Sequence, residues 1–351
     1  MFVVSAAPLT DFERFDPREV VKAAPDFFSR AFGHSLPGRT EHPLASSLDM
    51  ATICYAFGIT NARPGGNGGG ASVSHAMVLQ GAGTSGFAAV LQTAAAPVVL
   101  RAYQAATGGH PFAAALPMEN FRAQPIHAFD VGRELELVGE NSEIQCSAAF
   151  AKDAAYGIAQ VHTYAQIFEL SGADLLTNDT ASLMNLLRGG GVVAAQTETA
   201  LAVQAIDTAP ALSDGPVFDA SNTCAQALSA ESLGVAVGML RTQGAAGRPL
   251  NLAPRHLVVE PGLEMLARKL IRDADLSGLV QVSTLPGLAA GRWLVMADPE
   301  LMPSLALFHI RSVPVGFQVQ RSFKSNGVGM RVALDAGAGF VGRIGVVKGG
   351  A

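Results

Sequence analysis

The clearest alternation of apolar and polar positions lies between His256 and Asp273. Its first residues, 256–259, form a short apolar run that predicts a buried strand. Pro261 then stands where the first turn of a helix tolerates proline. Beyond it, apolar residues recur on one helical face at Leu263, Leu266, Ala267, Leu270 and Ile271. Glu264 and Arg268 stand four apart on the polar side and can pair weakly. The stretch predicts a strand that turns sharply into an amphipathic helix.

A second helical pattern follows Asn178-Asp179 and continues on both sides of Gly189-Gly190-Gly191. Its apolar positions include Leu183, Leu186, Leu187, Val193, Ala200 and Leu201. A glycine inside a helix costs about 1 kcal/mol relative to alanine, so we expect a kink or a close backbone contact there. Shorter helices are predicted over 87–96, with Ser85 as its N-cap, over 230–243, and from Asp49 to Phe57. Residues 11–39 mix phenylalanine, proline and charge with little periodicity, and no element is predicted in them.

From Arg133 the pattern changes to a period of two, and it returns between Val161 and Phe168. Two long strands with a tip of small and charged residues form a hairpin that is marginal by itself. Such an arm is explained if it lies on a neighbouring subunit, and the alternative is an ordinary hairpin on its own domain. The candidate inter-subunit contacts are Arg133, Glu134, Glu136, Glu140, Glu143, Lys152, Asp153 and, in a later turn, Asn326. Further strands are predicted at 293–296, 315–321 and 330–334, the last two framing the turn 324–327.

The composition shows a surplus of apolar residues that must be buried. The chain of 351 residues could hold one large domain or two to three smaller ones. Only 15% of its residues are charged, against about 25% in an average soluble protein. No uninterrupted apolar run approaches the roughly 18 residues of a membrane helix. The apolar surplus therefore fits either contacts between subunits or one large core.

Charge and cysteine usage exclude several classes of protein. The net charge of −5 and the scattered lysines and arginines offer no basic patch for nucleic acid. Cys54, Cys146 and Cys224 are few and far apart, which fits free thiols in a reducing cytosol better than disulfides or a zinc site. The N-terminus lacks the basic flank and the apolar core of a signal peptide.

Candidate chemistry is sparse. Residues 81–86 match G-x-G-x-x-G, but the next acidic residue, Glu119, is too distant to hold a ribose. Residues 337–342 match it again, too close to the end of the sequence for a nucleotide-binding unit. Cys146 and His162 could form a nucleophile and base, yet no third orienting residue is evident. The histidines show no metal-ligand spacing. We therefore expect no cofactor, no metal and no enzymatic activity.

The glycine-rich stretch 65–70 predicts a flexible linker and the main domain boundary. Residues 1–75 before it lack the Ser/His/Asp arrangement of a working protease. They could be a vestigial stub, an assembly-guiding segment that is removed, or an ordered appendage.

Several segments, in consistent order, resemble one family. Residues 254–264, Pro-Arg-His-Leu-Val-Val-Glu-Pro-Gly-Leu-Glu, look like the signature of tailed-bacteriophage major capsid proteins. The resemblance is greatest to Mu-like prophage head subunits and to the capsid part of phage protease–capsid fusions. Further matching segments are Thr84-Ser85, 120–122, Asn178-Asp179, 218–222, 293–298 and 335–338. The resemblance spans Thr84 to Lys348, and the order of the segments is more specific than any one of them.

The resemblance implies an α+β fold of the tailed-phage (Hong-Kong-type) capsid class. Its parts would be an N-terminal arm at 76–120 and an extended β-hairpin loop at 121–170. A peripheral domain with a long spine helix would comprise 171–214 and 313–351, and an axial domain would comprise 215–312. Residues 1–75 would be a leader or appendage.

The function that the resemblance implies is self-assembly into hexamers and pentamers of an icosahedral virion capsid around double-stranded DNA. Assembly would occur in the bacterial host cytoplasm, with a portal protein, and with scaffold or decoration proteins as further partners, and without a membrane. The alternatives are a cellular nanocompartment shell of the same fold and a soluble Cys/His hydrolase. Some family members join a loop lysine to a neighbour's asparagine, for which Lys152 and Asn326 supply the residue types.

Overall fold

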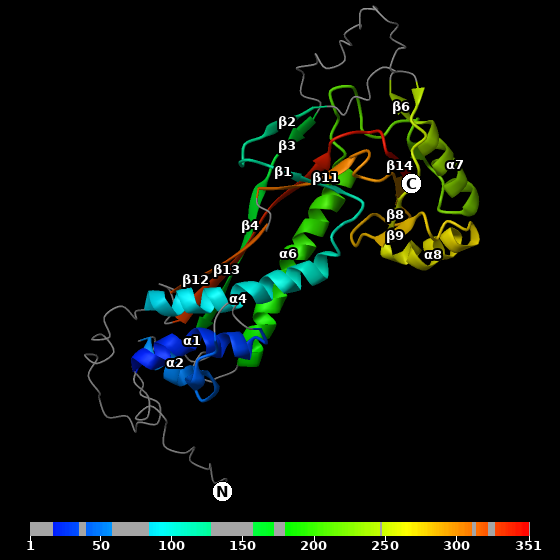
Figure 1. The fold of residues 1–351 in the computed structure, drawn as a ribbon. Coiled ribbons are helices and arrows are strands. Elements are labelled where there is room, and N and C mark those ends of the chain that lie inside the picture. Colours follow the sequence, from blue (N-terminus) through cyan, green and yellow to red (C-terminus); the bar gives the residue numbers. More distant parts are fainter. Residues whose placement is uncertain are drawn as a thin grey trace, which may run out of the picture. The chain divides into compact units, whose positions relative to one another are not determined.

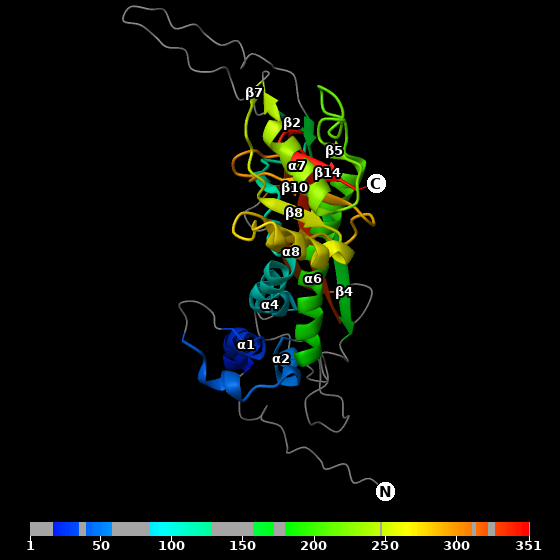
Figure 2. The ribbon, with the colours of Figure 1, turned by 90° about the vertical axis from the view of Figure 1, so that its right-hand side faces the viewer.

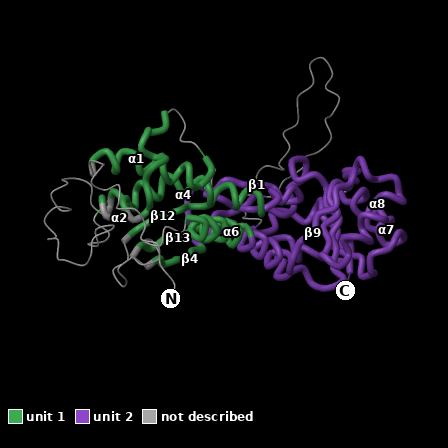
Figure 3. Tube along the Cα trace, turned by 90° about the horizontal axis from the view of Figure 1, so that it is seen from below, with its two compact units in different colours: residues 1–106, 164–195, 315–334 green, residues 107–163, 196–314, 335–351 purple. Residues whose placement is uncertain are grey.

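The computed structural model describes residues 17–34, 40–57, 84–127, 157–171, 180–245, 248–310, 314–321 and 327–350. The chain divides into two compact units (Figure 3). Unit 1 comprises residues 1–106, 164–195 and 315–334, and unit 2 comprises residues 107–163, 196–314 and 335–351. Two long elements, α6 (Thr180–Thr208) and β13 (Gly327–Phe340), are continuous through the boundary between the units.

Unit 1 is built mainly from helices. In chain order these are α1 (Pro17–Ala31), the short 3-10 helix η2 (Pro43–Ser46), α2 (Met50–Ala56), α4 (Thr84–Thr107) up to residue 106, and the first half of α6 (Figure 1). Its strands β4 (His162–Ser171), β12 (Val315–Arg321) and the first part of β13 share a sheet, in which β13 pairs with both others. β12 and β13 are antiparallel, with Val315 opposite Leu334.

Helix α1 corrects the expectation that residues 11–39 hold no regular element. Val20, Ala23, Ala24 and Phe28 are fully buried at helical spacing, so the segment has the apolar face that the mixed composition obscured. The Phe28 and Phe57 rings each meet the Phe87 ring edge-on, at centroid distances of 5.8 and 5.7 Å. Helices α1 and α2 are therefore packed against α4 by a shared aromatic cluster.

Helix α4 is longer than the predicted 87–96 and continues through Pro97. Because it begins at Thr84, Ser85 lies within its first turn and is not the residue before it. Proline inside a helix removes a hydrogen bond and favours a kink, but eight buried residues hold the helix within the unit. They are Phe87, Ala88, Leu91, Ala94, Ala95, Val98, Val99 and Tyr103. By length and composition alone, Gly86–Thr107 would also suit a membrane span.

The three glycines of α6 differ in their surroundings: Gly191 meets α4, Gly190 meets β13, and Gly189 has open space around it. A Cβ on Gly191 would collide with the carbonyl oxygen of Val99 and would lie 2.9 Å from the Tyr103 nitrogen. A Cβ on Gly190 would come within 2.8 Å of the Val332 side chain on β13. The expected close backbone contact is confirmed at Gly191, where the absence of a side chain allows α6 to approach α4 this closely.

Unit 2 contains a sheet of β5 (Thr223–Cys224), β14 (Val346–Gly349), β10 (Trp293–Met296), β8 (His256–Val259) and β9 (Gln281–Thr284), in that spatial order. Helices α7 (Ala230–Thr242) and α8 (Glu264–Asp273) cover one face of it (Figures 1 and 2). The remaining strands are β1 (Ala114–Pro117), which runs parallel to β11 (Leu305–His309), and the short pairs β2–β3 (Gln124–Ile126, Gly157–Ala159) and β6–β7 (Gly244–Ala245, Arg248–Pro249). The last part of β13 pairs with β11.

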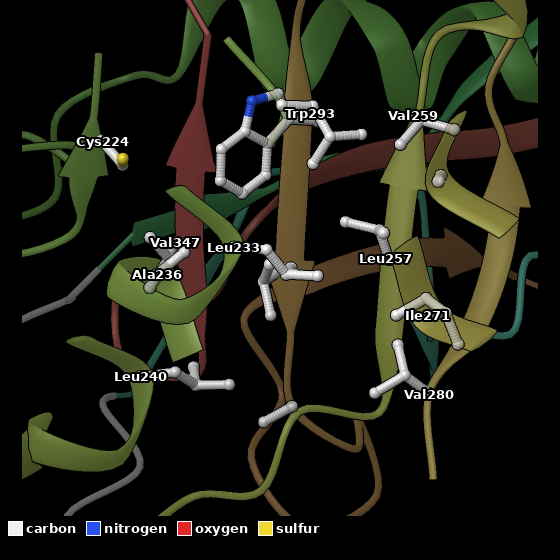
Figure 4. Packing of buried hydrophobic residues seen from close by; sticks show 14 of the residues in the cluster. Cys224, Leu233, Ala236, Leu240, Leu257, Val259, Ile271, Val280, Trp293 and Val347 are labelled. Carbon is white, nitrogen blue, oxygen red and sulfur yellow. The ribbon is translucent and has the colours of Figure 1, made fainter. Parts of the chain in front are cut away.

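The core beneath α7 and α8 is centred on Trp293 (Figure 4). Its indole is fully buried and donates a hydrogen bond to the Gln226 carbonyl at 3.2 Å. Leu233, Ala236 and Leu240 from α7 and Ala267 and Ile271 from α8 belong to the same buried cluster. The central strands β8 and β10 are buried along their whole length.

The predicted strand and helix between His256 and Asp273 are confirmed as β8, the 3-10 turn η4 (Pro261–Leu263) and α8. Glu264 and Arg268 form the expected pair at 2.8 Å. One position of the apolar stripe differs: Leu266 is 39% exposed, and its neighbour Met265 is 77% exposed. Helix α7 is also confirmed to within a residue.

Candidate functional site

The eight charged or polar residues predicted to contact a neighbouring subunit, between Arg133 and Asp153 and at Asn326, lie outside the described residues. Of the predicted extended loop, the structure describes the flanking strands β2 and β3, which pair with each other, and β4, which pairs with β13. Along β4, Tyr164, Phe168 and Leu170 are half-buried while Ile167 is 65% exposed. With Ile158 on β3, which is 71% exposed, at least two apolar side chains at the loop's base are therefore left without cover within the described chain.

The candidate nucleophile and base are not assembled in the described part of the chain. Cys146 lies outside it, and His162 is an exposed residue at the start of β4. Cys224 is a free, buried thiol on β5. Within the described residues, no three His, Cys, Asp or Glu side chains are grouped to hold a metal ion.

The second glycine-rich motif, at 337–342, has a structural explanation. Gly337 and Gly339 belong to β13, and a Cβ on Gly337 would collide with the Gln160 carbonyl oxygen. A Cβ on Gly339 would lie 3.3 Å from the Phe308 ring. Close packing of backbone and ring therefore accounts for these glycines.

A buried polar cluster in unit 2 joins α6, the turn after α4 and β11. Glu198 is 3% exposed, and its carboxylate lies 3.2 Å from His309 Nε2 and 3.4 Å from the Thr107 hydroxyl. His110 Nε2 lies 3.3 Å from the Thr199 hydroxyl. Burial lowers the pKa of His110, the Glu198 carboxylate opposes that shift, and His309 adds to it. The sequence carries no signal for this cluster, because its members come from segments far apart in the chain.

The surface around α8 and β9 holds a hollow of about 610 Å³ that we call the arginine pocket. Its lining is Arg255, Arg268, Ile271, Arg272 and residues 277–282. Arg268 is paired with Glu264, whereas the guanidinium groups of Arg255 and Arg272 form no hydrogen bond or ion pair with a described residue. Three cationic groups at one hollow repel each other, and an anionic partner would relieve that repulsion.

Apolar side chains accompany these arginines. Met265 is 77% exposed, and Leu279, which lines the pocket, is 60% exposed. On α7, Val235 is 50% exposed. A second hollow, of about 570 Å³, lies in unit 1 between the end of α1, α4 and α6, and it too combines apolar residues with two arginines, Arg101 and Arg188. Arginine and methionine beside exposed apolar side chains are typical of protein–protein interfaces.

Comparison with known proteins identifies a family. The sequence profile of a family described as phage capsid protein matches residues 155–349, which is more than half of the chain. No curated protein matches the sequence.

Solved structures with a similar arrangement include a virus-like particle from Pyrococcus furiosus (11% identity, 72% of this chain and 96% of that chain, TM-score 0.44). A structure described as Mycobacterium phage Che8 is similar at 14% identity over 68% of this chain and 96% of that chain, with a TM-score of 0.39. The holo-SrpI encapsulin complex from Synechococcus elongatus PCC 7942 is similar at 8% identity over 69% and 86%, with a TM-score of 0.45.

Proposed function

Since this chain belongs to the phage capsid protein family, we propose that it is the major subunit of an icosahedral phage head, assembling into hexamers and pentamers around double-stranded DNA. The family match is the observation that carries the proposal. It includes α6, α7, α8 and every strand of the unit 2 sheet. Of the other five-stranded sheet, the match includes β4, β11, β12 and β13 but not β1.

The surface of the described chain supports a role in assembly. Its exposed large apolar side chains are Phe121, Ile158, Ile167, Val192, Val193, Val235, Met265, Leu266, Leu279 and Leu301. They come from α6, α7, α8, the strands β3 and β4, and the connecting segments that hold Phe121, Leu279 and Leu301. Many modest contacts repeated by symmetry can add up to a stable closed shell.

The domain assignment that follows is also a proposal. The 29-residue helix α6 would be the spine helix of the peripheral domain, and α4 would belong to the N-terminal arm. The sheet with α7 and α8 would be the axial domain. Because β14 pairs with β10 inside that sheet, we place residues 346–349 in the axial domain together with 215–312. The extended loop would leave the chain between β2 and β3.

The proposed relation to DNA is enclosure without specific binding. The net charge of −5 and the absence of a basic run in the sequence leave no strong attraction for phosphate groups. A portal protein, and scaffold or decoration proteins, would be the other partners of the shell.

The proposal is tested by the size of the purified chain. Light scattering, with electron micrographs of the same sample, should show closed shells or free hexamers and pentamers. A lone 36.2 kDa monomer at high concentration would contradict it.

The contents of shells isolated from cells that make the whole particle separate a head from a nanocompartment. A phage head should hold nuclease-protected double-stranded DNA and a portal at one vertex. Shells filled with a protein cargo and free of DNA would instead identify a nanocompartment.

A further inference from the structure

We propose that the arginine pocket at α8 and β9 docks the outer face of α7 from a second copy of the chain. This inference rests on the proposed function and adds to it one specific contact between neighbours in a ring. Its two sides are the pocket residues Arg255, Arg268 and Arg272 and the exposed α7 residues that face away from the unit 2 core.

The pocket side calls for a protein surface with a carboxylate. The Arg255 and Arg272 guanidinium groups have no anionic partner among the described residues. Met265 and Leu279 present exposed apolar surface beside them. Duplex DNA would satisfy the arginines but would leave both apolar side chains in water, whereas a protein face covers them as well.

The outer face of α7 carries the carboxylate and the apolar side chain that the pocket calls for. Glu231, Gly234, Val235 and Gly238 are exposed and recur three and four apart, so they lie on one face of the helix. Glu231 forms no hydrogen bond or ion pair with a described residue, and it can therefore meet a guanidinium. Val235 is 50% exposed and offers an apolar contact to Met265.

The two glycines of this face have no role within the described chain. A Cβ on Gly234 or on Gly238 would meet no atom within 4 Å. Glycine disfavours a helix interior, and in α6 the same residue type is explained by the close approach of α4. A partner that packs closely on α7 would explain Gly234 and Gly238 in the same way.

The topology of unit 2 places the two surfaces toward opposite edges of one sheet. The spatial order is β5, β14, β10, β8, β9, with α7 packed on β14 and β10 and α8 packed on β8 and β9. A contact between the α8 side of one copy and the α7 side of the next is heterologous, because it joins two different surfaces. A heterologous contact forms a ring when its rotation closes after a whole number of copies, and a hexamer or a pentamer is such a ring.

The test uses the full-length chain with one charge reversal on each side, Arg272→Glu and Glu231→Arg. Each single variant should raise the concentration needed for half-assembly at least about tenfold, as measured by light scattering and micrographs. The double variant restores an opposite pair across the contact and should assemble near the wild-type concentration. Glu300→Arg, an exposed acid elsewhere in unit 2, is the matched control and should assemble as the wild type does.

A second variant separates assembly from folding. Gly238→Leu fills open space with a better helix former, so it should leave the thermal unfolding temperature unchanged or raised while it blocks assembly. The contact is refuted if the wild type assembles and both charge reversals and Gly238→Leu assemble equally well. The contact is also refuted if both single charge reversals impair assembly and the double variant folds but assembles no better than they do. A wild type that stays monomeric would instead refute the proposed function and, with it, this contact.

Discussion

Gly191 on α6 faces the backbone of Val99 on α4 with no space for a side chain. The contact joins two long helices at a point where neither can move aside, since the opposing atoms are backbone. Glycine is unfavourable in a helix interior, but the packing of α6 on α4 requires it at position 191.

Replacing Gly191 with alanine should therefore destabilise unit 1 although alanine is the better helix former. Its Cβ would collide with the Val99 carbonyl oxygen and would lie 2.8 Å from the Ala102 Cβ. Overpacking of this kind costs about 1–3 kcal/mol. Urea unfolding followed by far-UV circular dichroism measures the change. Gly189→Ala, in open space on the same helix, is the control and should stabilise the protein by about 0.5–1 kcal/mol. Equal effects of the two substitutions would show that the helices do not meet at Gly191.

Trp293→Ala should destabilise the unit 2 sheet by about 3–5 kcal/mol. The substitution leaves a cavity below α7 and α8 and also removes the hydrogen bond to the Gln226 carbonyl. Hydrogen exchange should rise in β8, β10 and β14 while α1 and α2 keep their protection. Uniformly raised exchange in both units would mean that they unfold together.

The aromatic cluster makes residues 17–57 depend on α4. Phe28→Ala removes the contact of α1 with the Phe87 ring, and it should weaken the docking of α1 and α2 by about 3–5 kcal/mol. We expect faster hydrogen exchange and earlier proteolytic cleavage in residues 17–57, with α7 and α8 unaffected. Phe121→Ala, a half-exposed phenylalanine of unit 2, should change neither measurement. Unchanged protection of α1 in the Phe28 variant would argue against the cluster.

Acid should destabilise the protein through His110. Burial holds the pKa of His110 below its ordinary value of 6.5, so the unfolded chain binds a proton more readily than the folded chain. The contribution of neutral His110 to the free energy of unfolding is fully present above pH 6.5. It is lost as the pH falls from there through the folded-state pKa of His110. His34 and His256 are shifted in the same direction by burial.

The His110→Asn variant measures this contribution. Asparagine tolerates the positive φ of 41° at this position and does not titrate in this range. The slope of the free energy of unfolding between pH 7.5 and 5.5 should decrease relative to wild type, and one histidine can account for at most about 1.4 kcal/mol per pH unit. The slope is compared, not the absolute stability, because the substitution also removes packing. An unchanged slope would show that His110 titrates normally.

The sequence predicted those elements whose pattern is local. The strand, turn and helix at His256–Asp273, the helix α7 and the close contact at the α6 glycines follow from periodicity and residue type within a few turns. Helix α1 was missed because the mixture of proline, phenylalanine and charged residues obscured an apolar face that is present at helical spacing. The ends of α4 were misplaced because Pro97 normally ends a helix, and tertiary packing overrode that preference.

The candidate site was less accessible to sequence reasoning. The Glu198 cluster and the arginine pocket join residues that are separated by tens of positions, and no spacing rule connects them. The predicted contacts from Arg133 to Asp153 lie outside the described residues and stay a prediction. The arginines of α8 were visible in the sequence, but only the fold places Arg255 beside them.

The chain passes from one unit to the other five times, at residues 106/107, 163/164, 195/196, 314/315 and 334/335. Neither unit is therefore encoded by one continuous stretch of the gene. A recombination event with a single crossover would leave a unit assembled from two different parents, with strands and helices that had not been selected to fit together. The two units should consequently be inherited as one block, and sequence divergence between relatives should accumulate by point substitution and loop change more than by exchange of whole units.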